Sequence, residues 1–275
     1  MLASAFIFAV MDCLIKALGP PFRVWDIAFY RFGIGMAVLL AIFARRCNLF
    51  SADSKKLLIF RGIAGYAAFL ALIIAIRLIP ISTALVLFYA YPAFAALFSV
   101  WIYKEKRPAQ LIWAFVALAG VAVFLDAKLE GGLLGQCISV LGAAFAGIAV
   151  ATLKKVRESN GTVMIYLYFC LTGAIVTSIP YFADPQIPAT VQEWLIVGGI
   201  VGTSVVAQLL MNEGFRYCGS CDGSILLTTE VFFVAVYGFL FLNEAITWRF
   251  WVGGIMILGS IVALNNGKAY KAKCV

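Results

Sequence analysis

One acidic residue inside an apolar run is the strongest candidate for chemistry in this chain. Glu230 follows Thr228 and Thr229 in a segment that is otherwise mostly apolar. An ionisable group within a membrane is costly and marks a substrate or proton pathway. Glu230, with Thr229 beside it, therefore predicts a proton-coupling site or a site for an ammonium group. The structural alternative is a protonated carboxyl group that is hydrogen-bonded between helices.

Asp12 and Arg31 form a second candidate group. Asp12 lies about two helical turns before the end of its apolar segment, and Arg31 about two turns after the start of the next one. The two side chains therefore have a similar depth in the membrane. Their segments are joined by a short turn, Gly19-Pro20-Pro21, which makes them antiparallel neighbours. The pattern predicts an Asp12–Arg31 pair. It is either a structural ion pair, or a pair that binds a charged substrate group or opens as an outer gate.

Amide and aromatic side chains could complete a binding cavity. Gln208 and Asn212 are four residues apart and share one face of a helix. Tyr66, Tyr89 and Tyr91 could supply an aromatic wall, which suits apolar, aromatic or cationic ligands. Because Tyr89 and Tyr91 are two residues apart, at least one of them is expected to pack against other helices instead.

Proline and glycine positions predict the shape of the bundle. Pro92 lies in the middle of an apolar segment and removes a backbone hydrogen bond there, which gives either a hinge or a simple bend. Small residues that allow close helix contacts recur at Gly131 and Gly135, at Gly198 and Gly202, and along residues 142–147.

The remaining polar features have structural interpretations. Glu213 precedes Arg216 by three residues, which favours a surface ion pair over a binding role. Cys218-Gly-Ser-Cys221 has the spacing of a metal or redox pair but has no second pair to complete a site, so small-residue packing is favoured. The chain has no histidine and no nucleophile elbow. We therefore expect no enzyme activity, no cofactor and no metal.

The elements that position these residues are expected to be transmembrane helices. The chain is 64% hydrophobic and only 12% charged, and runs of about 20 apolar residues match the thickness of a bilayer. Helices are required because lipid leaves no partner for backbone polar groups. Ten segments are predicted: Met1–Leu18, Trp25–Ala44, Leu57–Ile79, Ser82–Tyr103, Ala109–Leu125, Gly131–Leu153, Val163–Phe182, Val191–Tyr217, Gly223–Leu242 and Trp248–Leu264.

The net charge of +8 records orientation in the membrane. With a cytoplasmic N-terminus, fifteen lysines and arginines, Arg61 among them, fall on the inner side and five on the outer side. This bias in short loops follows the positive-inside rule and places both termini in the cytoplasm. The basic excess therefore indicates topology and not a nucleic-acid partner.

The chain is predicted to consist of two similar five-helix units, one after the other. Residues coincide at an offset of 139: Lys16 with Lys155, Arg77 with Arg216, Glu105 with Glu244 and Gly120 with Gly259. An odd number of spans per unit turns the second copy upside down, as in many secondary transporters. We predict an all-α integral membrane protein with inverted repeats at 1–126 and 131–267 and a basic cytoplasmic tail at 268–275.

Several short motifs in this order carry a family resemblance: Lys16, Phe29-Tyr30-Arg31-Phe32, Ala75-Ile76-Arg77, Tyr91-Pro92-Ala93-Phe94 with Glu105, and Glu230-Val231-Phe232-Phe233 with Glu244. At these residues the sequence resembles the drug/metabolite transporter superfamily, in the branch built from two EamA-type repeats. The resemblance implies alternating access around a central cavity formed by spans one, three, four, six, eight and nine. Val231 stands where the family often has proline, so the ninth span is expected to be straighter than the fourth.

The expected function is that of a secondary transporter in the cell or inner membrane. It would move small organic metabolites, amino-acid-like or related, and export is favoured over import because the superfamily leans that way. Its partners would be a small-molecule substrate and the lipid bilayer, and transport could be coupled to protons through Glu230, to solute exchange or to neither. A membrane scaffold or receptor is the alternative, and an intramembrane enzyme is the third.

Overall fold

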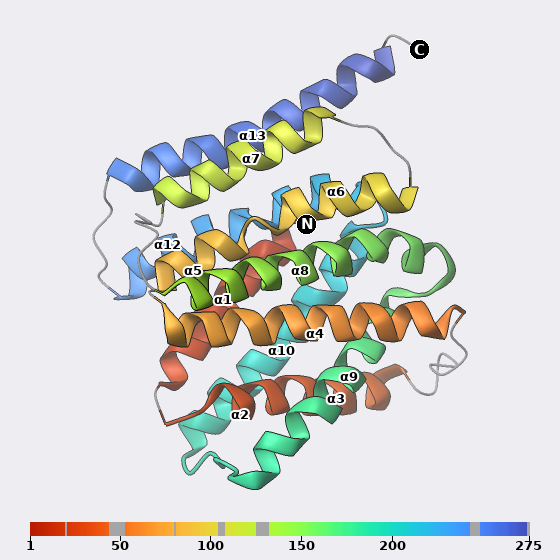
Figure 1. The fold of residues 1–275 in the computed structure, drawn as a ribbon. Coiled ribbons are helices and arrows are strands. Elements are labelled where there is room, and N and C mark those ends of the chain that lie inside the picture. Colours follow the sequence, from red (N-terminus) through yellow and green to blue (C-terminus); the bar gives the residue numbers. More distant parts are fainter. Residues whose placement is uncertain are drawn as a thin grey trace.

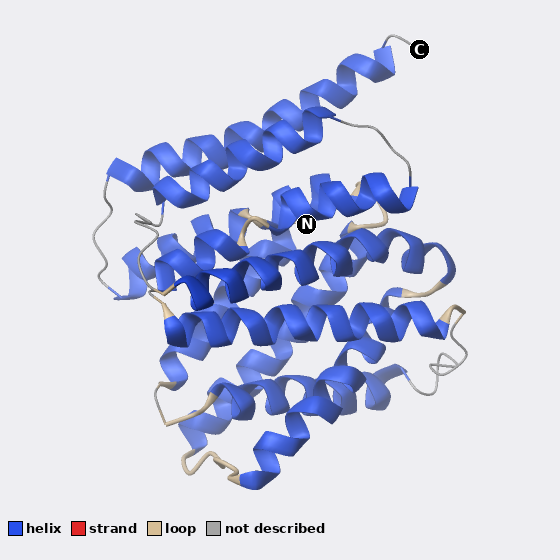
Figure 2. Cartoon of the chain, viewed as in Figure 1, coloured by secondary structure: helices blue, strands red, loops and turns tan. Residues whose placement is uncertain are grey.

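The computed structural model describes residues 1–19, 21–43, 53–79, 81–103, 108–124, 132–242 and 248–273, and within these ranges the regular structure is entirely helical (Figure 2). The helices are α1 Leu2–Leu18, α2 Val24–Phe29, the π-helix η1 Tyr30–Ile34, α3 Gly35–Phe43, α4 Lys55–Leu78, α5 Ile81–Phe88, α6 Tyr91–Tyr103, α7 Pro108–Phe124, α8 Leu133–Ser159, α9 Thr162–Ala183, α10 Val191–Gly214, α11 Ser220–Leu227, α12 Thr229–Leu242 and α13 Trp248–Lys273. Within the described residues, each of the ten predicted segments is occupied by one helix or by consecutive helices.

Within these described ranges, six helical stretches are long and apolar enough to cross a membrane: Val24–Phe43, Lys55–Ala75, Thr83–Ile102, Leu133–Ser159, Thr162–Ala183 and Val191–Gly214. Three shorter apolar helical stretches lie at Leu2–Ile15, Leu111–Val123 and Trp251–Ser260. Large apolar side chains such as Ile179 and Trp101 are more than three-quarters exposed. Such a surface suits lipid and not water.

Glycine lets α8 lie tightly against its neighbours. This helix packs on α4 and on α6 (Figure 1). A Cβ atom at Gly135 would lie 2.5 Å from the Ile79 side chain, and one at Gly147 would lie 2.5 Å from Cβ of Phe94. The prediction of close contacts is wrong for Gly198 and Gly202, where a Cβ atom would meet nothing within 4 Å. Gly131 lies outside the described residues.

The fourth and ninth segments are both interrupted, at positions 139 residues apart. The fourth breaks at Tyr89 and Ala90, between α5 and α6, just before the predicted Pro92. The ninth was expected to be straighter, yet it breaks at Thr228 without a proline. There the Thr228 hydroxyl donates to the carbonyl of Ile225 at 2.7 Å. Hydroxyl groups that bond back to their own helix in this way bend it.

Contacts between loops tie together each end of the bundle. Arg23 Nη1 donates to Asp184 Oδ2 at 2.7 Å, which joins the connection before α2 to the connection after α9. At the other end, Asn160 Nδ2 donates to the carbonyl of Asp53 at 3.0 Å. Thr190 begins α10 with a capping box, because its hydroxyl accepts from Glu193 N while the Glu193 carboxylate accepts from Thr190 N.

Candidate functional site

Two carboxyl groups meet where α1 packs against α12. The side chains of Asp12 and Glu230 share a hydrogen bond, and the charge of Arg31 acts on both of them. A hydrogen bond between two carboxyl groups requires a proton on at least one of them. The sequence singled out both acids but did not predict that they would form a pair. A pair of this kind can take up and release a proton.

Arg31 faces this pair from η1, in a wide π-helical turn of a kind that is frequent at functional sites. Its side chain is buried, and its Nε donates to Ser204 Oγ at 2.7 Å. Among the described residues no carboxylate forms an ion pair with Arg31, so the direct Asp12–Arg31 pair predicted from the sequence is wrong. The charge of Arg31 acts on Asp12 without a direct contact between the two side chains.

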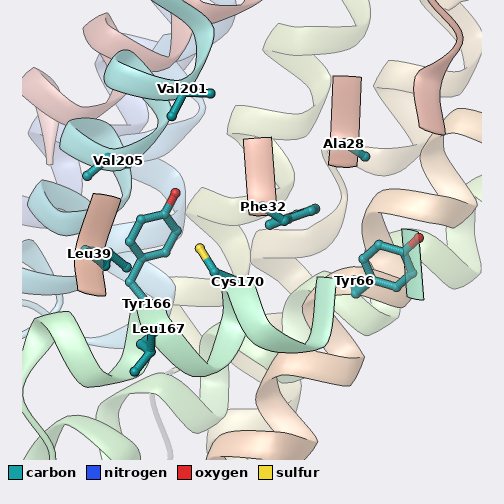
Figure 3. Packing of buried hydrophobic residues seen from close by; sticks show 9 residues of the cluster. All are labelled: Ala28, Phe32, Leu39, Tyr66, Tyr166, Leu167, Cys170, Val201 and Val205. Atoms are coloured by element: carbon teal, nitrogen blue, oxygen red, sulfur yellow. The ribbon is translucent and has the colours of Figure 1, made fainter. Parts of the chain in front are cut away.

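Ser204 links Arg31 to a second group of polar side chains. The hydroxyl of Tyr166 lies 3.3 Å from Ser204 Oγ. Figure 3 shows Tyr166 and Cys170 beside each other in a buried cluster with Phe32. Ser204 and Cys170 were not among the predicted site residues, because an isolated Ser or Cys gives no signal in an apolar helix.

The break in the fourth segment brings Tyr89 and Tyr91 together. Their ring centroids are 6.2 Å apart, and both side chains lie close enough to Glu230 to feel its charge. Both can lie near the acid because the helix is not continuous between them, and Tyr91 is also buried against α11, as expected for at least one of the two. Tyr91 Oη also donates to the carbonyl of Ser224 in α11 at 3.1 Å, which joins the two interrupted segments.

Three other predicted residues have local roles. Tyr66 lies in the buried cluster of Figure 3, on the other side of Phe32 from Tyr166, and its ring contacts Phe32 edge-on. Thr229 Oγ1 donates to the carbonyl of Leu226 at 2.7 Å, so its hydroxyl is engaged within the helix. Pro92 is buried at the start of α6 and has no N–H for the carbonyl four residues earlier.

The two amides of α10 do not act together. Gln208 is buried, with its Nε2 3.9 Å from Met211 Sδ. Asn212 Oδ1 accepts from Arg61 Nη2 at 3.2 Å. Arg61 was counted as a cytoplasmic loop charge, but it is only 6% exposed. Its position inside the apolar run after Leu57 was the signal that could have revealed this.

The predicted ion pair between Glu213 and Arg216 is confirmed, with Oε1 and Nη1 3.4 Å apart. Glu213 also accepts hydrogen bonds from Arg157 and, at 2.6 Å, from Thr162 Oγ1. This network ties α10 to α8 and α9. The thiol of Cys218 donates to the carbonyl of Gly214 at 3.2 Å.

Comparison with known proteins gives the family of the chain. The sequence matches the EamA-like transporter family over residues 1–125 and again over 133–266. The pseudopaline exporter CntI of Pseudomonas aeruginosa (strain UCBPP-PA14) is 24% identical over 96% of this chain and 94% of its own. The threonine/homoserine exporter RhtA of Salmonella typhimurium (strain SL1344) is 23% identical over 92% of this chain and 84% of its own.

The fold also has a counterpart of known structure. One crystal structure superposes with a TM-score of 0.81 at 19% sequence identity, and covers 94% of this chain and 93% of the other. The human solute carrier family 35 member G1 is 23% identical over 98% of this chain and 78% of its own. The similarity therefore extends over the whole helical bundle.

Proposed function

The chain belongs to the EamA-like transporter family, and from that premise we propose that it exports amino-acid-like metabolites by alternating access, in exchange for protons. The observation that carries this proposal is the Asp12–Glu230 carboxyl pair, with Arg31 beside it. A zwitterion has a carboxylate for the arginine and an ammonium group for the acids. The similarity to exporters, one of them for threonine and homoserine, supports the same class of substrate.

The carboxyl pair would couple transport to protons by competition. When both acids are deprotonated, the pair attracts the ammonium group of a substrate that enters from the cytoplasm. A proton that arrives from the outer side then replaces the ammonium group and lowers the affinity for the substrate. Tyr89 and Tyr91 would surround the ammonium group with aromatic faces, which also favours cations.

The interrupted segments would provide the moving parts. Breaks in membrane helices next to binding sites are common in secondary transporters. Here one break, at Tyr89–Ala90, comes directly before Tyr91. The other, at Thr228, lies two residues before Glu230. Rocking of one repeat against the other at these breaks would expose the carboxyl pair to each side in turn. Pro92 remains the proposed hinge of the fourth segment.

We also propose ten spans in two inverted repeats, with both termini in the cytoplasm. In this topology the connections before α2 and after α9 are both on the outer side, and the Arg23–Asp184 contact joins them. The connections after α3 and after α8 are both on the inner side, and the Asn160–Asp53 contact joins them. If any one of the second to seventh segments did not cross, Arg23 and Asp184 would lie on opposite sides of the membrane despite their contact.

Cysteine labelling tests this topology. In a variant without the native cysteines, Asp184→Cys is expected to react with a membrane-impermeant maleimide in intact cells, because the residue is exposed at the outer end. Glu158→Cys, exposed at the other end, is expected to react only in inside-out vesicles. Labelling of both positions from the same side would contradict the ten-span topology.

Uptake into inside-out vesicles tests the transport proposal. Radiolabelled L-threonine and L-homoserine are the first probes, followed by other amino acids. An acidic vesicle interior is expected to drive accumulation, and a protonophore is expected to abolish it. Accumulation that does not depend on the pH gradient would contradict proton exchange. Absence of uptake for every amino acid would contradict the proposed substrate class.

A further inference from the structure

A second buried arginine, distant in sequence from the carboxyl pair, lacks a counter-ion. Arg61 is 6% exposed, and among the described residues no carboxylate forms an ion pair with it. Its Nε has no hydrogen-bond partner there either. A buried charge without a partner is costly, and such groups are normally paired. This arginine therefore has unused capacity to bind an anion.

The neighbour of Arg61 has the same unused capacity. Asn212 is fully buried, and its Oδ1 accepts from Arg61 Nη2 at 3.2 Å. Its Nδ2 has no partner among the described residues. Arg61 and Asn212 thus hold each other in place, while one buried nitrogen of each, Arg61 Nε and Asn212 Nδ2, keeps its N–H donors free. A guanidinium edge and an amide N–H are donors that match the two oxygens of a carboxylate.

We propose that Arg61 and Asn212 form a carboxylate-binding subsite at the cytoplasmic end of the bundle. Arg61 lies six residues into α4, about 9 Å along the helix axis from its first residue. Asn212 lies two residues before the end of α10. The acid nearest in sequence, Glu213, is occupied by Arg157, Thr162 and Arg216 and leaves the subsite free.

Aromatic rings connect this subsite to Arg31. The Arg61 guanidinium carbon lies 6.0 Å from the centroid of the Phe169 ring. Phe169 meets Phe32 at 5.1 Å between centroids, and the Arg31 guanidinium carbon lies 5.4 Å from the Phe32 ring. A substrate carboxylate released from Arg61 would be taken up next by Arg31, on the other side of these two rings. This last step rests on the proposed function, whereas binding at Arg61 does not.

The test uses the purified full-length protein in detergent and acetate as the probe. At constant ionic strength, sodium acetate in place of sodium chloride is expected to raise Tm by about 3–6 °C at roughly ten times the dissociation constant of acetate. Acetamide, which has the same shape and no charge, is expected to have no effect. An equal shift from chloride or phosphate would overturn the assignment of a carboxylate site.

Variants locate the effect. Arg61→Gln is expected to abolish the acetate shift. Arg31→Gln is expected to retain it, because Arg31 lies beside the two acids and acetate lacks the ammonium group that would offset their charge. Lys155→Gln, which removes an exposed positive charge from the same end, is the matched control and also retains it. Loss of the shift in Arg31→Gln, or its survival in Arg61→Gln, would overturn the proposal.

Asn212→Asp keeps the test decisive if Arg61→Gln does not fold. The new carboxylate would occupy the free donors of Arg61, so this variant is expected to have a higher Tm without acetate and no response to acetate. A retained response would contradict the subsite. The acetate assay needs no transport, so failure of vesicle uptake with an intact Arg61-dependent shift would contradict only the proposed function.

Discussion

Glu230→Gln is expected to lower proton-driven uptake into inside-out vesicles by at least about 100-fold, the lower range for loss of a positioned proton-transfer group. Glutamine keeps the size and a hydrogen bond to Asp12 but cannot release a proton. Exchange of one substrate molecule for another is expected to survive better than net transport, because exchange needs no proton release. The measurement compares pH-driven uptake with substrate counterflow in the same vesicles.

Asp12→Asn should resemble Glu230→Gln, and the double variant should be little worse than either single variant. The two acids share one hydrogen bond and act as a unit, so their effects are not additive. Glu158→Gln, at an exposed position, is the control and should transport normally. Normal pH-driven uptake by both single variants would remove the carboxyl pair from the mechanism.

Gly147→Ala is expected to destabilise the protein by about 1–3 kcal/mol, the usual cost of overpacking. The new Cβ atom would lie 2.5 Å from Cβ of Phe94 and 2.8 Å from the backbone nitrogen of Ala95. These atoms belong to α6 itself, so the whole helix must move away from α8. Thermal and denaturant unfolding in detergent measure the loss.

Gly202→Ala is the matched control for this prediction. Its Cβ atom would meet nothing within 4 Å, so no helix has to move. Alanine has a higher helix propensity than glycine, which gives an expected gain of up to about 1 kcal/mol. Equal losses in the two variants would show that α8 does not depend on close contact at Gly147.

Helix positions could be predicted from the sequence because membrane thickness imposes length and apolarity on each segment. The break near Pro92 was also predictable, since proline removes a backbone donor. The break at Thr228 was not, because it depends on hydroxyl groups that could equally have faced other helices. The position of both Tyr89 and Tyr91 near Glu230 was not predictable for a related reason, since a break rotates one side chain relative to the other.

The acids and Arg31 were recognisable because charges are rare inside apolar runs. Their pairing was not, since only the packing of α1 against α12 brings Asp12 to Glu230. Lipid is as apolar as the protein interior, so periodicity does not reveal which face of a helix points inward. The burial of Arg61 was not predicted, because the sequence does not distinguish a charge a few residues inside a helix from a charge in the preceding loop.

The contact between Asp12 and Glu230 forms late during synthesis of the chain. The two residues lie 218 positions apart in the chain. At a synthesis rate of about 5–20 residues per second, the ribosome makes Asp12 roughly 10–40 s before its partner. During that interval the first half of the chain holds an acid in the membrane with no carboxyl group to share its proton. Asp12 therefore forms its hydrogen bond to a second carboxyl group only after the ninth segment has been made and inserted.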